Sequence, residues 1–526
     1  MYECPNCTGN LKFDIATQAL KCDYCGTTMN PYDYQKEQDA METSLGEDEY
    51  EVTVFTCPQC GGELISNDNT AATFCSFCGG STILDSRISH EKRPDYIIPF
   101  QKTAEDCREI YAEMMKGAIF APSELKDKEY IKRFRSIYMP YWVYQFQKDG
   151  HASFVGSQTR EQNDQTITQF FRLESDIQAG YKGITFDASA SFSDNLSNAV
   201  APFEWREARP FTPAFLSGFY ADAGDVGAEI YEEDARQIVT DDMCREMKKD
   251  PTCAQYDLGD DLASAMRPET TKREKAMFPL WFLTWRKRDR VNYVVINGQT
   301  GKAAGDIPVD KRKYLMWSVL LAVPIFLLLN LFLTMRPSVL LILTAIFSLI
   351  CGVFSVGQAK LLRARRLGTD DKGRWGNLKV EEPGGIRIGL PENTVNVLSV
   401  CAAMLIAAWL TWNGAPQVVI TLAMMGMLLL AGLLQQKTMG RRRKHRRYGI
   451  SGQELVETLT KPVLGILISL AAILLHPSDW ICYGAALVAM GMMVLNILEL
   501  IDRYNLLATV ELPQFDRRGG SEDGSR

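Results

Sequence analysis

The sequence predicts a chain of several domains: two small β modules near the N-terminus, a soluble domain of mixed helices and strands (α/β or α+β), and an α-helical membrane domain of about six spans. Three observations predict it. Eight of the 14 cysteines lie in four Cys-x-x-Cys pairs near the N-terminus. Helical and strand patterns alternate through the middle of the chain. Beyond Asp310, uncharged apolar runs recur at the length that a bilayer needs.

The overall charge of −7 hides two opposite halves. Residues 1–310 hold 33 Lys and Arg against 50 Asp and Glu, whereas residues 311–526 hold 24 against 14. Residues 1–21 have neither the basic start nor the apolar segment of a cleavable signal. We therefore expect the cysteine pairs to be made in the cytosol, where thiols stay reduced.

The cysteine pairs form an internal repeat. CPNC…CDYC aligns with CPQC…CSFC at an offset of 53 residues, and 14 residues separate the two pairs in each copy. Two residues between thiolates form a knuckle that presents both sulfurs to one ion, and a hairpin of 14 residues can bring the second knuckle opposite the first. The predicted ligands are Cys4, Cys7, Cys22 and Cys25 in one site and Cys57, Cys60, Cys75 and Cys78 in the other.

A site of four sulfurs with no open position is typical of structural Zn²⁺, so we expect two structural zinc ions. Iron in a rubredoxin-like site is the competing metal, because four thiolates accept it too. Zinc is favoured since nothing else in the sequence indicates electron transfer. Packing of the cysteines without metal is disfavoured, because segments of about 30 residues bury too little apolar surface to fold unaided.

The repeat resembles the transcription factor IIB-type zinc ribbons. The layout resembles a bacterial family of membrane proteins with one or two such ribbons, a soluble domain with a Pro-aromatic-Trp pattern, and membrane spans. Proteins of this kind are sometimes labelled as relatives of the primosomal replication-restart helicase, which also has paired Cys-x-x-Cys knuckles. This sequence contains no phosphate-binding loop: the nearest string, GQTGKA at 298–303, lacks the first glycine and the magnesium-binding hydroxyl.

In the soluble domain, Thr103 can cap a helix with Asp106 at the capping-box position, and a second helix is expected at 227–249. Strands are expected at 141–146 and at 293–296, the second one turned by an Asn-Gly pair.

The strings MPYWVYQF and FPLWFLTW repeat at an offset of 139 residues. Their tryptophans, Trp142 and Trp281, are expected in the core, with a shared ligand groove as the alternative. GxSxG, HExxH and GxGxxG motifs do not occur, and no His or basic group in the sequence marks Cys107, Cys244 or Cys253 as reactive. We therefore expect no enzyme and no catalytic residue.

The apolar runs predict six membrane spans, at residues 315–335, 339–356, 395–412, 418–434, 463–475 and 480–498. The fifth run is short and could borrow length from 455–461 across Pro462. Tight turns close three hairpins, and basic loops, including RRRKHRR at 441–447, lie between them. The positive-inside rule then places both termini in the cytoplasm of a multi-pass membrane protein, with binding of anionic lipid as an alternative role for RRRKHRR.

The expected divisions are zinc ribbon 1 at 1–30, an acidic linker at 31–52, zinc ribbon 2 at 53–86, a cytoplasmic α+β domain at 94–310, the membrane domain at 315–500 and a disordered tail at 511–526.

The charge of the ribbons indicates which class of partner they can bind. Residues 1–85 hold three basic side chains against fourteen acidic ones, and phosphate neutralisation supplies most non-specific affinity for nucleic acid. We therefore expect membrane lipids and a protein as partners and disfavour nucleic acid. The leading hypothesis is a non-enzymatic scaffold at the membrane. The alternatives are a membrane-tethered nucleic-acid-binding or transcription-related regulator, and an enzyme or transporter with an unfamiliar site.

Overall fold

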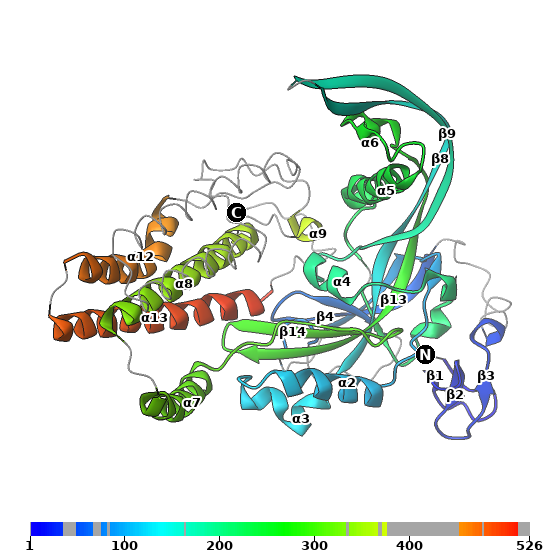
Figure 1. The fold of residues 1–526 in the computed structure, drawn as a ribbon. Coiled ribbons are helices and arrows are strands. Elements are labelled where there is room, and N and C mark those ends of the chain that lie inside the picture. Colours follow the sequence, from blue (N-terminus) through cyan, green and yellow to red (C-terminus); the bar gives the residue numbers. More distant parts are fainter. Residues whose placement is uncertain are drawn as a thin grey trace, which may run out of the picture.

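The computed structural model describes residues 2–34, 49–66, 75–80, 85–162, 165–222, 224–332, 336–366, 371–375, 452–475 and 478–513. Within these ranges lie a three-stranded sheet, a larger sheet of 13 strands, and a group of long apolar helices (Figure 1). The structure thus confirms the coarse prediction of two four-cysteine clusters, a mixed α/β sheet domain and membrane-type helices.

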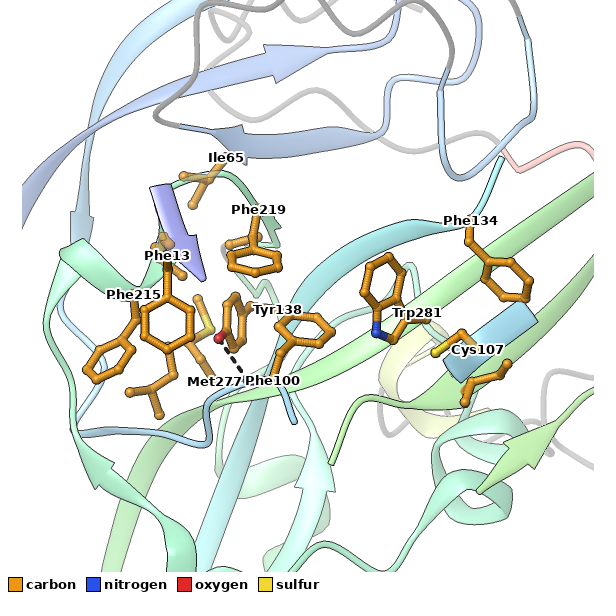
Figure 2. Packing of buried hydrophobic residues seen from close by; sticks show 14 of the residues in the cluster. Phe13, Ile65, Phe100, Cys107, Phe134, Tyr138, Phe215, Phe219, Met277 and Trp281 are labelled. Atoms are coloured by element: carbon orange, nitrogen blue, oxygen red, sulfur yellow. Dashed lines mark hydrogen bonds between the residues drawn. The ribbon is translucent and has the colours of Figure 1, made fainter. Parts of the chain in front are cut away.

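Ribbon 1 has its own small antiparallel sheet, made of β1 (Leu11–Asp14), β2 (Ala19–Cys22) and β3 (Thr28–Met29). One face of this sheet packs on the soluble domain. The Phe13 ring lies 5.1 Å from the Phe215 ring, centroid to centroid, and the Phe13 amide donates to the Ser217 carbonyl at 3.0 Å (Figure 2).

Ribbon 2 is part of the larger sheet. Its cysteines lie around β4 (Glu49–Thr56), β5 (Glu63–Ser66) and β6 (Asp85–Lys92), and β4 pairs with both of the others. β5 also pairs with β11 (Tyr220–Ala221) of the soluble domain. The expected boundaries at 53 and 86 therefore fall inside strands, because an isolated hairpin leaves unpaired edges that a neighbouring strand can satisfy. Most of the expected linker, residues 35–48, lies outside the described residues.

The main path of the larger sheet runs β10-β7-β13-β8-β11-β5-β4-β6. Its remaining strands on this path are β7 (Tyr96–Ile97), β8 (Arg135–Gln162), β10 (Arg209–Pro210) and β13 (Glu269–Lys287). β8 and β13 carry the two halves of the predicted repeat and pair antiparallel, with Met139 opposite Phe278. The strands that branch from this path are β9 (Gln165–Asp187), β12 (Asp257–Leu258), β14 (Arg290–Asn297), β15 (Ala303–Ala304) and β16 (Val510–Glu511).

Two hydrophobic cores cover opposite faces of this sheet. Along β13, Met277, Trp281 and Leu283 enter one core, while Phe278 and Phe282 enter the other. This period of two is what a strand buried on both faces requires. Figure 2 shows the first core, where aromatic rings from ribbon 1, β8 and β13 meet.

Helices pack on the faces of the sheet. The expected helix after Thr103 is α2 (Ala104–Gly117), which lies in the first core, and its capping box with Asp106 is present as predicted. The helix expected at 227–249 is α5 (Glu229–Lys249), which packs against β8. The short helices are η1 (Ser123–Lys126), α3 (Lys128–Ile131), α4 (Asp194–Val200), η2 (Trp205–Glu207), η3 (Pro213–Leu216) and α6 (Asp261–Ala265).

Beyond the sheet, β8 and β9 continue together as a long curved arm (Figure 1). They stay paired from Tyr141 and Asp187 to Gln162 and Gln165. α5 and α6 lie on the concave side of the arm, where alternate residues of both strands are buried or half-buried, and the convex side is exposed and mostly polar. The sequence showed only the first part of β8 as a strand.

The turn expected at Asn297-Gly298 differs in the structure. A five-residue loop, 298–302, joins β14 to β15 and is closed by the Asn297 amide, which donates to the Lys302 carbonyl at 2.9 Å; Gly301 rather than Asn297 has a positive φ, of 80°. The Asn297 side chain accepts from the Gln299 amide at 2.9 Å and donates to the Val200 carbonyl at 3.0 Å. The asparagine therefore joins two loops instead of forming a two-residue turn.

Within the described residues, three helices are long and apolar enough to span a membrane: 337–366, 454–475 and 479–508. They correspond to α8 (Pro337–Arg366), α12 (Gly452–Leu475) and α13 (Asp479–Ala508). Pro462 lies inside α12, which includes the length borrowed from 455–461.

Six spans are not supported by these helices. The runs at 395–412 and 418–434 lie outside the described residues. The first run begins in α7 (Lys311–Phe332), which starts with three basic residues and is not one of the three. The described segment between α8 and α12 holds the short helix α9 (Lys372–Trp375).

α8, α12 and α13 pack as a bundle, with polar pairs between them. Thr344 and Ser469 place their hydroxyl oxygens 3.0 Å apart, and Ser355 donates to the Asn496 amide oxygen at 3.2 Å. Such pairs satisfy polar groups where water is absent.

The end of α13 is fixed to the soluble domain. Arg290 of β14 donates to the Thr509 hydroxyl at 2.7 Å and to the Leu506 carbonyl at 2.9 Å. Arg365 of α8 donates to the Leu507 carbonyl at 2.6 Å, and β16 then pairs with β14. Carbonyls at the end of a helix need such donors. The membrane bundle and the soluble domain are therefore joined rigidly at this point.

Candidate metal centres

Each four-cysteine cluster is assembled from two knuckles of the same design. In cluster 1, the Cys4 amide donates to the Gly9 carbonyl at 2.7 Å and the Cys22 amide to the Thr27 carbonyl at 2.9 Å. In cluster 2, the Cys57 amide donates to the Gly62 carbonyl and the Cys75 amide to the Gly80 carbonyl, both at 2.9 Å. These bonds close each turn so that both of its sulfurs face the opposite knuckle.

The sulfurs lie at distances that suit one ion. The Sγ atoms of Cys57 and Cys78 are 3.8 Å apart, and those of Cys60 and Cys75 are 3.7 Å apart. A tetrahedral site with Zn–S bonds of about 2.3 Å has edges of about 3.8 Å. In cluster 1 the distances are 3.5 Å, for Cys4 to Cys25 and for Cys7 to Cys22. All eight predicted cysteines therefore meet in two groups that could hold metal ions, consistent with zinc.

Glycines allow the chain to pass close to the sulfurs. A Cβ atom on Gly9 would come 2.7 Å from the Tyr24 ring and 3.3 Å from the sulfurs of Cys7 and Cys22. Gly26 and Gly79, which follow the second pairs, have positive φ angles of 75° and 66°. Both of these glycines directly follow a cysteine of the repeat, whereas nothing in the cysteine spacing marked Gly9.

The two clusters differ in their surroundings. In cluster 1, Cys4 and Cys22 are buried while Cys7 and Cys25 are exposed. All four cysteines of cluster 2 are buried, and they belong to the hydrophobic core that includes Phe55 and Phe77. One cluster therefore lies at the surface and the other inside the soluble domain.

Strands of the soluble domain hold the knuckles of cluster 2 directly. Thr284 of β13 donates to the Ser76 carbonyl, and Tyr293 of β14 donates to the Phe77 carbonyl. Arg286 donates to the Gln59 side-chain oxygen at 2.9 Å. Sequence reasoning missed all of these partners, because more than 200 residues separate each of them from the knuckle that it contacts.

The thiols of cluster 2 influence one another's ionisation. Hydrogen bonding with the Cys60 sulfur lowers the pKa of Cys57, whereas hydrogen bonding with Cys57 raises the pKa of Cys75. The four sulfurs therefore compete for ionisation in a buried place. A dication would supply the charge that lets all four become thiolates.

A threonine hydroxyl contacts cluster 1 at its exposed side. The Thr27 hydroxyl lies 3.0 Å from the Cys25 sulfur, and this hydrogen bond lowers the pKa of Cys25 to about 6. Asn6 donates to the same hydroxyl at 2.9 Å, which fixes its position. Such outer contacts orient metal ligands and favour the thiolate.

The other cysteines considered in the sequence lie apart from these clusters. Cys107 and Cys253 are buried, and burial raises the pKa of Cys107 to about 12. Cys244 is half-buried on α5. His151 is exposed on the arm, with Nδ1 3.0 Å from an Asp176 oxygen.

The two tryptophans of the repeat do not form a groove. Trp142 lies opposite Lys275 and Trp281 opposite Ser136, so six residues of β8 separate the two positions. Each indole nitrogen donates to a separate backbone carbonyl, that of Val226 for Trp142 and that of Lys102 for Trp281. Trp281 is buried in the first core, as the core interpretation expected.

No protein-family model matches the chain, and no solved structure matches it significantly. The chain is similar to the uncharacterized protein YdjG of Bacillus subtilis (strain 168), with 27% identity over 320 residues. These residues cover 60% of this chain and 92% of that relative. The relative's name states no activity, so the resemblance to transcription factor IIB-type ribbons and the primosomal label stay predictions.

Proposed function

We propose that the chain is a non-enzymatic scaffold, anchored in the membrane, that presents an acidic zinc-ribbon head to a protein partner at the cytoplasmic face. Both clusters then hold zinc as structural ions. The observation that carries the proposal is the difference between the clusters: cluster 2 is enclosed by the soluble domain, whereas the Cys7 and Cys25 knuckles of cluster 1 face solvent.

The coordination chemistry supports a structural role. Four sulfurs complete a tetrahedral shell, so a substrate would find no open position on the ion. Zinc is preferred over iron because a closed site of four thiolates is typical of structural zinc and nothing else in the sequence indicates electron transfer. The ions would hold two small modules in shape, as their size requires.

The surface of ribbon 1 supports contact with a protein. Tyr24 lies in the exposed knuckle and is 82% exposed, and its ring lies over Gly9. A large aromatic side chain in a fixed position is typical of the residues that dominate binding energy at protein interfaces. Tyr24 is therefore our candidate for the centre of the contact.

Charge supports a protein partner over nucleic acid. Residues 1–85 contain three basic and fourteen acidic side chains, and four thiolates around a dication add two negative charges to each ribbon. Phosphates would be repelled by such a surface. A basic patch on a protein is the complementary partner.

The proposed topology has six spans with both termini in the cytoplasm. Three basic residues precede the apolar part of α7, and Arg363, Arg365 and Arg366 end α8. Basic residues stay at the cytoplasmic side, where the soluble domain is also joined to α13. At the opposite end of α13, Trp480 is 87% exposed, as expected of an aromatic belt at the outer interface.

The test is capture of partners on the full chain, extracted in detergent and treated with nuclease. Wild type, Tyr24→Ala and Phe170→Ala are compared, since Phe170 is an equally prominent aromatic, 74% exposed on the arm. We expect one specific protein with wild type and Phe170→Ala, and its loss with Tyr24→Ala. Recovery of nucleic acid alone, or of no protein that depends on Tyr24, would refute the proposal. A gel shift at low salt tests the regulator alternative.

A further inference from the structure

The loop at 118–122, between α2 and η1, is apolar and uncharged, with the sequence AIFAP. Ala121 is 2% exposed, as expected for the core side of a loop, yet Ile119 is 61% exposed. The loop is held by its own backbone, with the Ile119 amide donating to the Gly117 carbonyl at 3.1 Å and the Ala121 amide to the Ala118 carbonyl at 3.2 Å. Ile119 is therefore presented outward from a fixed position.

This loop is attached to the start of α7. The Asp310 amide donates to the Phe120 carbonyl at 2.8 Å, and Lys313 donates to the Ala121 carbonyl at 2.9 Å. The rings of Phe120 and Tyr314 meet edge to face, with 5.2 Å between their centroids. The apolar run of α7 begins at the next residue, Leu315. Figure 1 shows α7 beside the α2 and α3 region.

The level of the membrane surface follows from α13. Its apolar run ends at Leu498, and Glu499, Asp502 and Arg503 follow on the cytoplasmic side. Asp502 forms an ion pair with Lys311 at the start of α7. Tyr314 lies three residues further along α7, or about 4.5 Å toward its apolar part. Its partner Phe120, and Ile119 beside it, therefore lie where the apolar part of α7 begins.

We propose that the 118–122 loop is a membrane-contact site, with Ile119 inserted among the lipid headgroups next to α7. The occupant of this surface is the bilayer itself, because the loop continues the surface by which α7 enters the lipid. Exposed apolar side chains at this depth bind an interface in the same way as those of interfacial helices. The contact would fix the distance and tilt of the soluble domain above the membrane. It rests on the proposed function in one respect, that α7 spans the membrane.

The test uses the full chain in nanodiscs of phosphatidylethanolamine and phosphatidylglycerol. A photocrosslinking amino acid, p-benzoylphenylalanine, replaces Ile119, Leu320 or Ile238 in three separate proteins. Leu320 is 59% exposed on α7, and Ile238 is 50% exposed on α5 in the soluble domain. After illumination, mass spectrometry measures lipid adducts at each position. Size exclusion and zinc content show that each protein is folded.

We expect lipid adducts at 119 and 320 and none above background at 238. Adducts at 320 but not at 119, or a crosslink from 119 to protein, would overturn the membrane-contact site and leave the span intact. Loss of adducts at both 119 and 320 would overturn the proposed α7 span together with the contact. Equal adducts at 119 and 238 would show unspecific reaction and also overturn the proposal.

Discussion

Replacing one cysteine in either cluster should destabilise the fold to a different extent, because the two clusters occupy different surroundings. Cys75 is 1% exposed and its cluster shares a core with Phe55, Leu64 and Phe77. Cys25 is exposed, and its ribbon has a separate sheet. We predict that Cys75→Ser unfolds the soluble domain, whereas Cys25→Ser unfolds ribbon 1 and leaves the large sheet folded.

The magnitude follows from the metal. A structural zinc site contributes about 10–16 kcal/mol of apparent binding free energy in small modules. A whole domain is stable by only about 5–15 kcal/mol. Loss of the ion from cluster 2 therefore removes about as much free energy as stabilises the whole soluble domain, because β4 and β5 of ribbon 2 are strands of the large sheet. The same loss in cluster 1 acts on β1, β2 and β3, which form a separate sheet, and on the contacts of this sheet with the first core.

The assay combines metal content with thermal unfolding of the full chain in detergent, followed by near-ultraviolet circular dichroism. Cys107→Ser is the matched control, because Cys107 is completely buried but belongs to neither cluster. It should keep both ions and melt a few degrees lower. We expect one ion and a retained transition for Cys25→Ser, and no cooperative transition for Cys75→Ser. A wild-type melting curve for Cys75→Ser would refute the reasoning.

Three further predictions concern other parts of the chain. Burial raises the pKa of Asp187 well above its ordinary value, so the folded protein holds this proton more tightly than the unfolded chain does, and the free energy of unfolding falls as the pH rises above the ordinary range of a carboxyl group. Asp187→Asn should therefore have a higher melting temperature than wild type, and the difference should widen from pH 5 to pH 8. A difference that narrows over this range would contradict the prediction. Gly9→Ala should weaken metal retention by cluster 1 against a chelator, because its methyl group meets the Tyr24 ring, whereas Gly180→Ala, which meets nothing within 4 Å, should not. Arg290→Met removes donors to the Thr509 hydroxyl and the Leu506 carbonyl, so hydrogen exchange at 506–512 should accelerate, while Arg288→Met at the neighbouring exposed tip should leave it unchanged.

Local signals in the sequence predicted much of the site. The spacing of the cysteines predicted the two groups of four sulfurs that the structure brings together, because a knuckle and a hairpin are short-range structures. The capping box at Thr103 was confirmed for the same reason. Apolar runs found the three helices that are suited to a membrane, since length and composition alone decide that property.

Long-range pairing could not be predicted. The repeat made the ribbons look equivalent, yet ribbon 2 joins the large sheet through β5 and β11, whose paired residues Ile65 and Ala221 are far apart in sequence. The arm was missed although apolar residues alternate along the middle of β9, at Phe171, Leu173 and Ile177; strand pairing alone defines its outermost part. Phe77 was the available signal, because the corresponding residue of ribbon 1 is Tyr24, which carries a hydroxyl and is 82% exposed.

The zinc and iron content of the full chain, purified from cells without added metal, tests the central claim most directly. Elemental analysis should find two zinc ions per chain and no iron, and a chelator that removes them should abolish the folded soluble domain. Iron at either cluster, or a chain that stays folded with neither ion, would contradict the account.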